Sequence, residues 1–332
     1  ATSAKTNKFT DFTTQFSGPL IKDKLFFFLS AQRYHLNQDP AGPSTIRDEV
    51  SPRVNAKINY QPSSSNNFMA HIQYDAYNII GRVPGAYTYV ATDAITNRED
   101  APEWVWMANW RHLFGSKTFS EIKFAGYTGF YDLNPEVNAP GRFDEFGTPT
   151  VSQGWFYYAD RARNQINASL SHHADKWGKH DLKFGVEVER SKVRNRYGYV
   201  NDILYYDYGG APYYAYSYGY DIGAKNQREA LFVQDSWQIS DRLTLNLGLR
   251  AERFGGVHDP QDGQQDVGKV WSTRALAPRL GFAWTPFDSR DLVVRGSAGL
   301  YFDRVPLRAL ANALLSADNT TDLSKLRQRN IA

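Results

Sequence analysis

Apolar and polar residues alternate one by one in this chain, over runs of about ten positions. Between Val54 and Tyr60, every even-numbered residue is apolar and every odd-numbered residue is polar. Successive side chains of a β-strand point to opposite faces, so each run predicts a strand with one apolar and one polar face. This length suits a tilted strand that crosses a membrane, because strands of globular sheets average about five or six residues.

The predicted strands come in pairs. We predict pairs at 9–18 with 25–35, 51–60 with 67–78, 103–112 with 118–131, 161–172 with 180–193, 227–239 with 242–254, and 276–285 with 291–302. Short turns join the partners, whereas the pairs are separated by the long segments 36–50, 79–102, 132–160, 194–226 and 255–275. Outer-membrane β-barrels sort their connections in this way, with short periplasmic turns and long extracellular loops. The sequence therefore predicts an all-β protein, an antiparallel transmembrane β-barrel with about twelve strands present.

Composition agrees with a barrel. No run reaches the roughly 18 apolar residues of a membrane helix, and the mean hydropathy is −0.55. A barrel spreads its lipid-facing residues over alternate positions, which keeps hydropathy low. Aromatic residues make up 15% of the chain, and many lie beside the short turns, where an interfacial girdle is expected: Phe16, Phe26, Tyr60, Phe68, Phe114, Phe119, Trp177, Trp237, Trp284 and Phe287.

Two residues fit the alternation less well. Asp235 has the same parity as Leu231 and Val233, so its carboxylate would face lipid unless a β-bulge redirects it. Pro278 lies inside a predicted strand, where proline is usual only at an edge or a rim.

The chemistry of the chain argues against an enzyme. It contains no cysteine, and we find no nucleophile elbow, zinc-protease motif or phosphate-binding loop. The neighbours His172 and His173 would point to opposite faces of a strand, which does not favour a metal site. A net charge of +3 without basic blocks gives no reason to expect nucleic acid. We expect no catalytic residue, cofactor or metal.

Several stretches resemble TonB-dependent receptors, in particular their Oar-like branch. Phe16–Phe28 (FSGPLIKDKLFFF) is similar to an early hairpin of that branch. Leu231–Trp237 (LFVQDSW), continuing through Asp241–Arg250 (DRLTLNLGLR), resembles the most recognisable barrel hairpin of the family. Ala277–Trp284 (APRLGFAW) and Gly299–Arg304 (GLYFDR) resemble the hairpin after it. The resemblance covers nearly all strands but not the loops.

The resemblance implies a barrel of about 22 strands, closed by its own plug domain and coupled to the TonB energy-transducing complex. Both ends of the chain lie on the long-loop side, so we expect residues 1–332 to be an internal part of the barrel domain, without the plug and the C-terminal strands. Residues 303–332 are then an extracellular loop tail, with helical spacing of its leucines. The expected location is the bacterial cell outer membrane, in contact with its lipid.

Two groups of residues are candidates for a site. Charged residues of the polar parity should line the lumen: Arg53, Lys57, Lys183, Glu187, Glu189, Arg250 and Arg295. The loop around 194–225 is rich in tyrosine, which offers a large contact area and a hydroxyl group at a small entropy cost. We hypothesise that this loop binds a sugar or a peptide, through Tyr205, Tyr206, Tyr208, Tyr213, Tyr214, Tyr216 and Tyr218.

The function predicted from the sequence is TonB-dependent uptake of an unidentified ligand, such as a siderophore, an oligosaccharide or a peptide. One alternative is an adhesion or structural barrel without transport. Another is a closed barrel of about twelve strands, acting as a porin or a lipid hydrolase. A soluble all-β carbohydrate-binding protein is the remaining rival.

Overall fold

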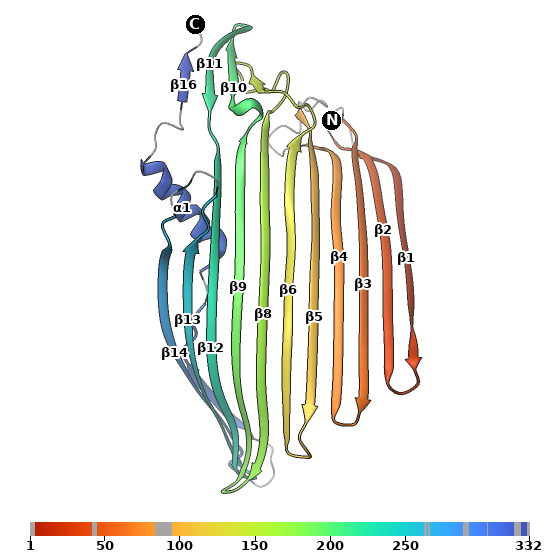
Figure 1. Cartoon of the computed structure of the whole chain (residues 1–332), viewed down its shortest axis with the longest axis vertical. Coiled ribbons are helices and arrows are strands. Elements are labelled where there is room, and N and C mark those ends of the chain that lie inside the picture. Colours follow the sequence, from red (N-terminus) through yellow and green to blue (C-terminus); the bar gives the residue numbers. More distant parts are fainter. Residues whose placement is uncertain are drawn as a thin grey trace.

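Long antiparallel strands dominate the computed structural model, which describes residues 4–41, 45–83, 95–261, 264, 266–287, 292–303, 305–321 and 327–330. One sheet of 12 strands runs in the order β1-β2-β3-β4-β5-β6-β8-β9-β12-β13-β14-β15 (Figure 1). Its strands are β1 (Lys5–Ile21), β2 (Leu25–Asp39), β3 (Arg47–Ser63), β4 (Asn66–Arg82), β5 (Asn97–Leu113), β6 (Thr118–Pro135), β8 (Trp155–Asp175), β9 (Lys179–Tyr199), β12 (Tyr220–Ser240), β13 (Leu243–His258), β14 (Lys269–Trp284) and β15 (Val294–Gly299).

Each predicted strand corresponds to one strand of this sheet, and each predicted partner is a neighbour in it. Most strands are longer than predicted, and they extend mainly on the long-loop side. β9, for example, continues to Tyr199, six residues beyond the predicted end at 193. Backbone pairing needs no alternation once a strand has left the membrane, so the periodic signal ends before the ladder does. β15 is shorter than the predicted 291–302, and residue 291 lies outside the described part.

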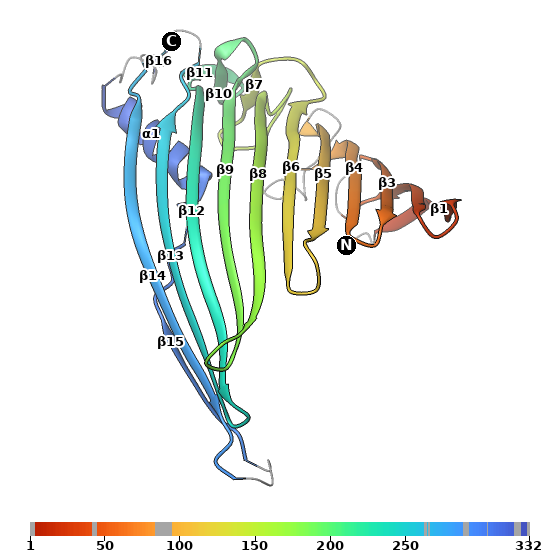
Figure 2. The same cartoon turned by 60° about the horizontal axis from the view of Figure 1, so that its bottom comes forward.

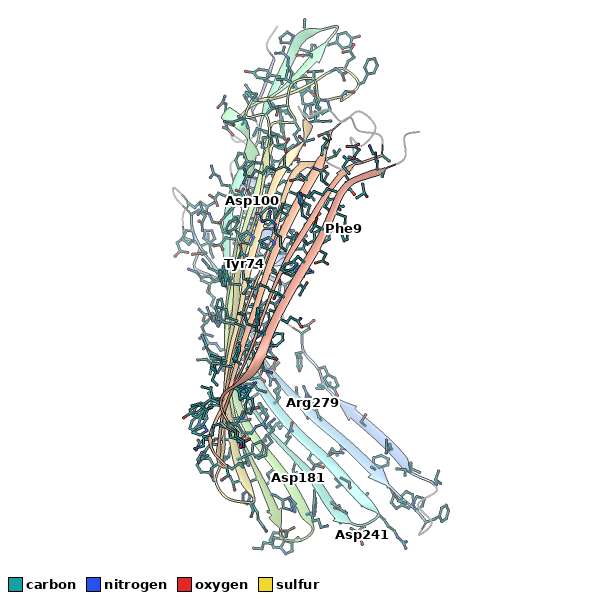
Figure 3. The ribbon with its side chains drawn as sticks, turned by 90° about the vertical axis from the view of Figure 1, so that its right-hand side faces the viewer. Phe9, Tyr74, Asp100, Asp181, Asp241 and Arg279 are labelled. Atoms are coloured by element: carbon teal, nitrogen blue, oxygen red, sulfur yellow. The ribbon has the colours of Figure 1, made fainter. Side chains whose placement is uncertain are left out.

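The sheet is curved and open in the described part of the chain. β1 and β15 form its two edges and are not paired with each other. Figure 2 shows the sheet bending like the wall of a wide cylinder, and Figure 3 shows its twist from the side. The all-β class and the antiparallel sheet of the predicted barrel are confirmed, whereas the total of about 22 strands stays a prediction.

The two faces of the sheet differ in character. Val233 of β12 lies opposite Phe184 of β9 and Leu249 of β13, and the same register places apolar side chains on one face throughout. We call this the apolar face. Its exposed side chains include Val54, Ile58, Ile72, Trp104, Ile122, Phe124, Ile166, Leu170, Phe184, Val186, Leu231, Leu247, Leu280 and Phe282. An apolar surface that spans so many strands indicates contact with lipid, because water-soluble monomers rarely expose large apolar patches.

Aromatic rings stack on the apolar face beside the short turns. The ring of Phe68 lies 6.2 Å from that of Tyr60 and 6.0 Å from that of Trp110. Such rings suit the level of the lipid headgroups. Phe26 and Phe119, also expected in the girdle, belong instead to the register of the opposite, polar face.

Asp235 lies on the apolar face without a bulge, because the register of β12 is uninterrupted from Ala224 to Gln238. Its Oδ2 is 2.7 Å from Nδ1 of His180 on the neighbouring strand β9. The imidazole stacks against the ring of Trp237 at 5.2 Å. The carboxylate is therefore paired with an imidazole that an aromatic ring covers, close to the short turn.

Pro278 occupies a position that a proline tolerates. The pairing of β14 with the edge strand β15 begins only at Arg279, so the missing N–H of Pro278 interrupts no bond to β15. Its carbonyl oxygen still accepts a hydrogen bond from the N–H of Leu300, at 3.0 Å.

The long loops contain structure of their own. A second sheet has the order β16-β11-β10-β7 and joins three separate segments of the chain. Its strands are β7 (Gly141–Phe143), β10 (Leu204–Tyr208), β11 (Ala211–Ser217) and β16 (Arg327–Asn330), and a short 3-10 helix, η3 (Val200–Asp202), precedes β10. Segment 194–226, predicted as one loop, thus contains the end of β9, a hairpin and the start of β12.

Helix α1 (Leu307–Thr321) lies across the loop end of β9 and β12 (Figures 1 and 2). It buries Leu310, Ala311 and Leu314 against a small apolar patch on the polar face, formed by Val193, Ile222 and Ala224. No described helix has the length and apolar character needed to span a membrane.

Candidate functional site at the loop rim

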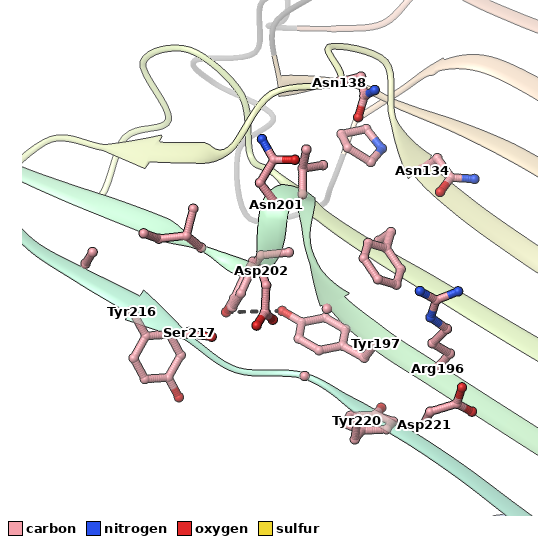
Figure 4. A pocket seen from close by; sticks show the side chains of 18 of the residues that line it. Asn134, Asn138, Arg196, Tyr197, Asn201, Asp202, Tyr216, Ser217, Tyr220 and Asp221 are labelled. Atoms are coloured by element: carbon pink, nitrogen blue, oxygen red, sulfur yellow. Dashed lines mark hydrogen bonds between the residues drawn. The ribbon is translucent and has the colours of Figure 1, made fainter. Parts of the chain in front are cut away.

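A large hollow lies at the loop rim, where β9, η3, β11 and β12 meet (Figure 4). Its volume is about 1550 Å³. It is lined by Asn134, Pro135, Asn138, Phe156, Arg194, Arg196, Tyr197, Gly198, Tyr199, Val200, Asn201, Asp202, Ile203, Ala215, Tyr216, Ser217, Gly219, Tyr220, Asp221 and Gln264. The hollow therefore draws on three of the long segments, 132–160, 194–226 and 255–275, which the main sheet brings together.

Tyrosine rings form a continuous cluster at this hollow. Tyr197 of β9 lies opposite Tyr220 of β12, and their rings stack with centroids 5.7 Å apart. Tyr199 meets Tyr197 edge to face at 5.7 Å, and the Tyr197 hydroxyl donates a hydrogen bond to that of Tyr199 at 3.4 Å, the dashed line in Figure 4. Tyr216 and Tyr218 extend the cluster from β11 toward β12. The side chains thus present flat faces and hydroxyl groups together.

Burial raises the pKa of Tyr197, Tyr199, Tyr216 and Tyr220 above the ordinary value. The cause is the removal of water from the phenol, which disfavours the charged phenolate. These phenols therefore stay protonated over the physiological pH range, and each can donate as well as accept a hydrogen bond.

The two arginines that line the hollow, Arg194 and Arg196, each contact another side chain. Arg194 donates two hydrogen bonds to the carboxylate of Asp221, at 2.8 and 2.6 Å. The guanidinium of Arg196 lies 5.2 Å from the ring centre of Phe156. Both arginines occupy even-numbered positions of β9, whereas Tyr197 and Tyr199 occupy odd-numbered ones, so the two pairs of side chains point to opposite faces of the strand. The hollow therefore extends around both faces of the end of β9.

The turn after β9 has an unusual backbone. Asn201 and Asp202 have φ angles of 56° and 58°, in the left-handed region that non-glycine residues rarely adopt. Asn and Asp tolerate this region better than other side chains. Two such residues in succession turn the chain sharply, and both side chains border the hollow.

The predicted tyrosines fall into three groups. Tyr216 lines the hollow, and Tyr218 stacks on Tyr216 and contacts Tyr220 without lining it. Tyr206 and Tyr214 stack across the β10–β11 hairpin with centroids 4.6 Å apart, and the guanidinium of Arg142 lies 5.9 Å from the Tyr205 ring. Tyr208 and Tyr213, at the hairpin tip, are 71% and 60% exposed. Their role in binding stays a prediction.

Other lining residues carried no signal in the sequence. Asn134 lies at the end of β6, Asn138 belongs to the loop after β6, and Gln264 belongs to the loop after β13. Asparagine and glutamine are ordinary loop residues, so only the folded arrangement shows that they share a hollow with the tyrosines.

Charged residues are concentrated on the polar face. Arg53, Lys57, Lys183, Glu187, Glu189, Arg250 and Arg295, the predicted lumen residues, all belong to its register. Arg250 contacts both Glu187 and Glu252, Arg228 is 2.9 Å from Glu252, and Arg163 is 2.8 Å from Glu189. These ion pairs cross from β8 to β13 as a ladder. That the face lines a lumen remains a prediction.

Residues 42–328 match the family model described as an outer membrane beta barrel domain. Because this match covers most of the chain, the chain belongs to that family, and it is part of a bacterial outer-membrane protein. Among curated proteins it is similar to the TonB-dependent transporter Oar of Myxococcus xanthus, with 28% identity over 172 residues, which are 46% of this chain and 16% of Oar. The resemblance to TonB-dependent receptors is thereby confirmed.

Solved structures share the fold. The outer membrane transporter YddB from Escherichia coli matches with a TM-score of 0.65 at 11% identity, over 97% of this chain and 40% of YddB. The alcaligin outer membrane receptor FauA from Bordetella pertussis matches with a TM-score of 0.60 at 10% identity, over 86% of this chain and 40% of FauA. The chain therefore spans less than half the length of these proteins.

Proposed function

We propose that this chain is the ligand-capturing part of a TonB-dependent receptor, which takes up a ligand through the outer membrane with energy from the inner membrane. The observation that carries the proposal is the arrangement of the sheet: one face is apolar, the other bears ion pairs, and a large hollow opens at one rim. A wall of this kind separates lipid from water while its loops meet the ligand.

The proposal assigns each surface a partner. The apolar face contacts outer-membrane lipid, and the ion-pair ladder faces the protein's own plug domain. Coupling to TonB would come from a segment outside residues 1–332. The names of the similar proteins, a TonB-dependent transporter and an outer membrane receptor, support this assignment.

Uptake by whole cells tests the proposal. Cells with the full-length protein, cells without it, and cells with the protein but no TonB are incubated in the same nutrient extract, and the compounds removed from it are compared by mass spectrometry. We expect at least one compound to be removed only by cells that have both proteins. Identical profiles in all three strains would contradict transport and favour an adhesive or structural barrel.

A further inference from the structure

We propose that the hollow at the loop rim binds a neutral oligosaccharide, an inference that rests on the proposed receptor function and names its class of ligand. The arguments are the flat tyrosine cluster, the mixture of hydrogen-bonding groups, the charge balance and the size of the hollow.

The tyrosine cluster provides stacking surfaces. A pyranose ring carries C–H bonds on its faces, and these pack well against the negative face of an aromatic ring. The ring of Tyr197 lies 5.7 Å from the rings of both Tyr199 and Tyr220, and it also contacts the rings of Trp155 and Tyr218. A row of rings suits a ligand built from repeated rings better than one with a single flat group.

The polar groups around the rings suit hydroxyl groups. Asn134, Asn138 and Asn201 each contribute a carboxamide, which both donates and accepts hydrogen bonds. The carboxamide of Gln264 holds the loop instead, because its Nε2 donates to the backbone oxygen of Asp221 and its Oε1 accepts from the N–H of Gln261. Asp202 adds an acceptor and Ser217 a hydroxyl. Sugar hydroxyls also act in both directions, so this mixed set matches them, whereas an anion would be matched by donors alone.

The charge balance favours a neutral ligand. The charged residues that line the hollow are Arg194, Arg196, Asp202 and Asp221, and their formal charges cancel. The Arg194 guanidinium is already bound to Asp221 through two hydrogen bonds, and that of Arg196 lies over Phe156. A strongly anionic ligand would need an excess of available cations, because charge-assisted hydrogen bonds provide most of such recognition.

The size of the hollow points to an oligomer. Its volume of about 1550 Å³ exceeds the roughly 300–1,000 Å³ of sites for single drug-sized ligands. An extended peptide is the strongest rival, since it could add a strand to the edge of β11. In this structure β16 already pairs with that edge, from Ser217↔Arg327 to Tyr214↔Asn330.

Calorimetry on the full-length protein in lipid nanodiscs tests the inference. The probes are maltohexaose and chitohexaose as neutral oligosaccharides, hexagalacturonate as an acidic one, and hexa-alanine as a peptide. We expect at least one neutral probe to bind, and Tyr197→Ala and Tyr220→Ala each to weaken its binding about tenfold, which corresponds to the roughly 1.4 kcal/mol of a good ring contact.

Matched variants make the result specific. Tyr301→Ala removes a tyrosine that is 73% exposed, outside the hollow and outside the predicted binding loop, so it should leave binding unchanged. Tyr197→Phe keeps the ring and should bind within about threefold of the native protein. Heat-modifiable migration on gels checks that each variant still forms a barrel.

Two results would overturn the inference: binding of hexagalacturonate or hexa-alanine alone, or equal effects of Tyr197→Ala and Tyr301→Ala. The receptor proposal fails separately. If a neutral probe binds but no cell removes any compound in a TonB-dependent way, the result supports the oligosaccharide site and contradicts transport. If TonB-dependent removal occurs but only charged compounds are taken up, the result supports transport and contradicts a neutral ligand.

Discussion

Asp235 shows how a single charged residue is accommodated on a surface that faces lipid. Its carboxylate meets His180 at 2.7 Å, and only about 16% of its side chain is exposed. The Trp237 ring covers the imidazole, and its indole N–H donates to the backbone oxygen of Trp177 at 2.9 Å. Asp235 belongs to the LFVQDSW motif of the β12–β13 hairpin, but its partner His180 belongs to the preceding β8–β9 hairpin.

We predict that removing the histidine of this pair destabilises the protein more than removing the charge of the aspartate. His180→Leu leaves a carboxylate on the apolar face without its partner and should destabilise the protein by about 1 to 3 kcal/mol. Asp235→Asn leaves a histidine that can be neutral, so its effect should be smaller. The double variant His180→Leu/Asp235→Leu should recover most of the loss, because replacing both partners removes the unpaired charge.

Urea unfolding of the full-length protein in lipid vesicles measures these differences. The matched control is Thr244→Val, at a partly exposed position near the same rim on the neighbouring strand. The single variant Asp235→Leu completes the cycle, and a double variant whose loss equals the sum of the His180→Leu and Asp235→Leu losses would show that the histidine and the carboxylate do not interact.

At the level of elements, the sequence determined the membrane strands well and the loops poorly. The turns at Asp175–Lys179 and Ser240–Asp241 are short, and alternating runs enter and leave them, so partner and register follow from the chain itself. The hollow depends on bringing together residues far apart in sequence, such as Asn134 and Tyr216, which both line it, and no local pattern encodes such an arrangement. Tyrosine content pointed to a loop that lines the hollow, and among the predicted tyrosines Tyr216 does so, but the prediction left out Tyr197, Tyr199 and Tyr220.

Helix α1 provides a test at the same level. Its leucines cover Ala224, which is 0% exposed, so loss of this packing should uncover the strand beneath. The chain has no cysteine, and Ala224→Cys therefore introduces a single reporter thiol. We predict that adding Leu310→Asp increases the rate of maleimide labelling at residue 224 at least about tenfold, because a buried unpaired carboxylate disfavours the docked helix.

The control for this experiment is Arg308→Asp, a charge change at an exposed position of the same helix. It should leave the labelling rate close to that of Ala224→Cys alone. Fast labelling of Ala224→Cys without any helix substitution would contradict stable packing of α1 on β9 and β12.

For the molecule as a whole, the sheet has an apolar face and a polar face, and adjacent residues of one strand lie on opposite faces. Ile72 of β4 is an exposed residue of the apolar face, and Gln73 belongs to the polar face. We predict that Ile72→Lys destabilises the full-length protein in lipid vesicles by about 2 to 4 kcal/mol, since a lysine near the middle of the bilayer must leave water.

Gln73→Lys is the matched control, with the same new side chain one position away. It should change the free energy of unfolding by less than about 1 kcal/mol, as expected on a hydrated face. Equal losses for the two variants would contradict the assignment of the faces, and with it the membrane orientation of the sheet.

The second sheet has a consequence for how proteins of this family diversify. β7, the β10–β11 hairpin and β16 come from three separate stretches of the chain, yet they share one hydrogen-bonded ladder. A change of length in one stretch would disturb the pairing of the others. Related bacteria should therefore exchange these stretches as a set, and escape from a phage or toxin that recognises one of them should leave compensating changes in its neighbours.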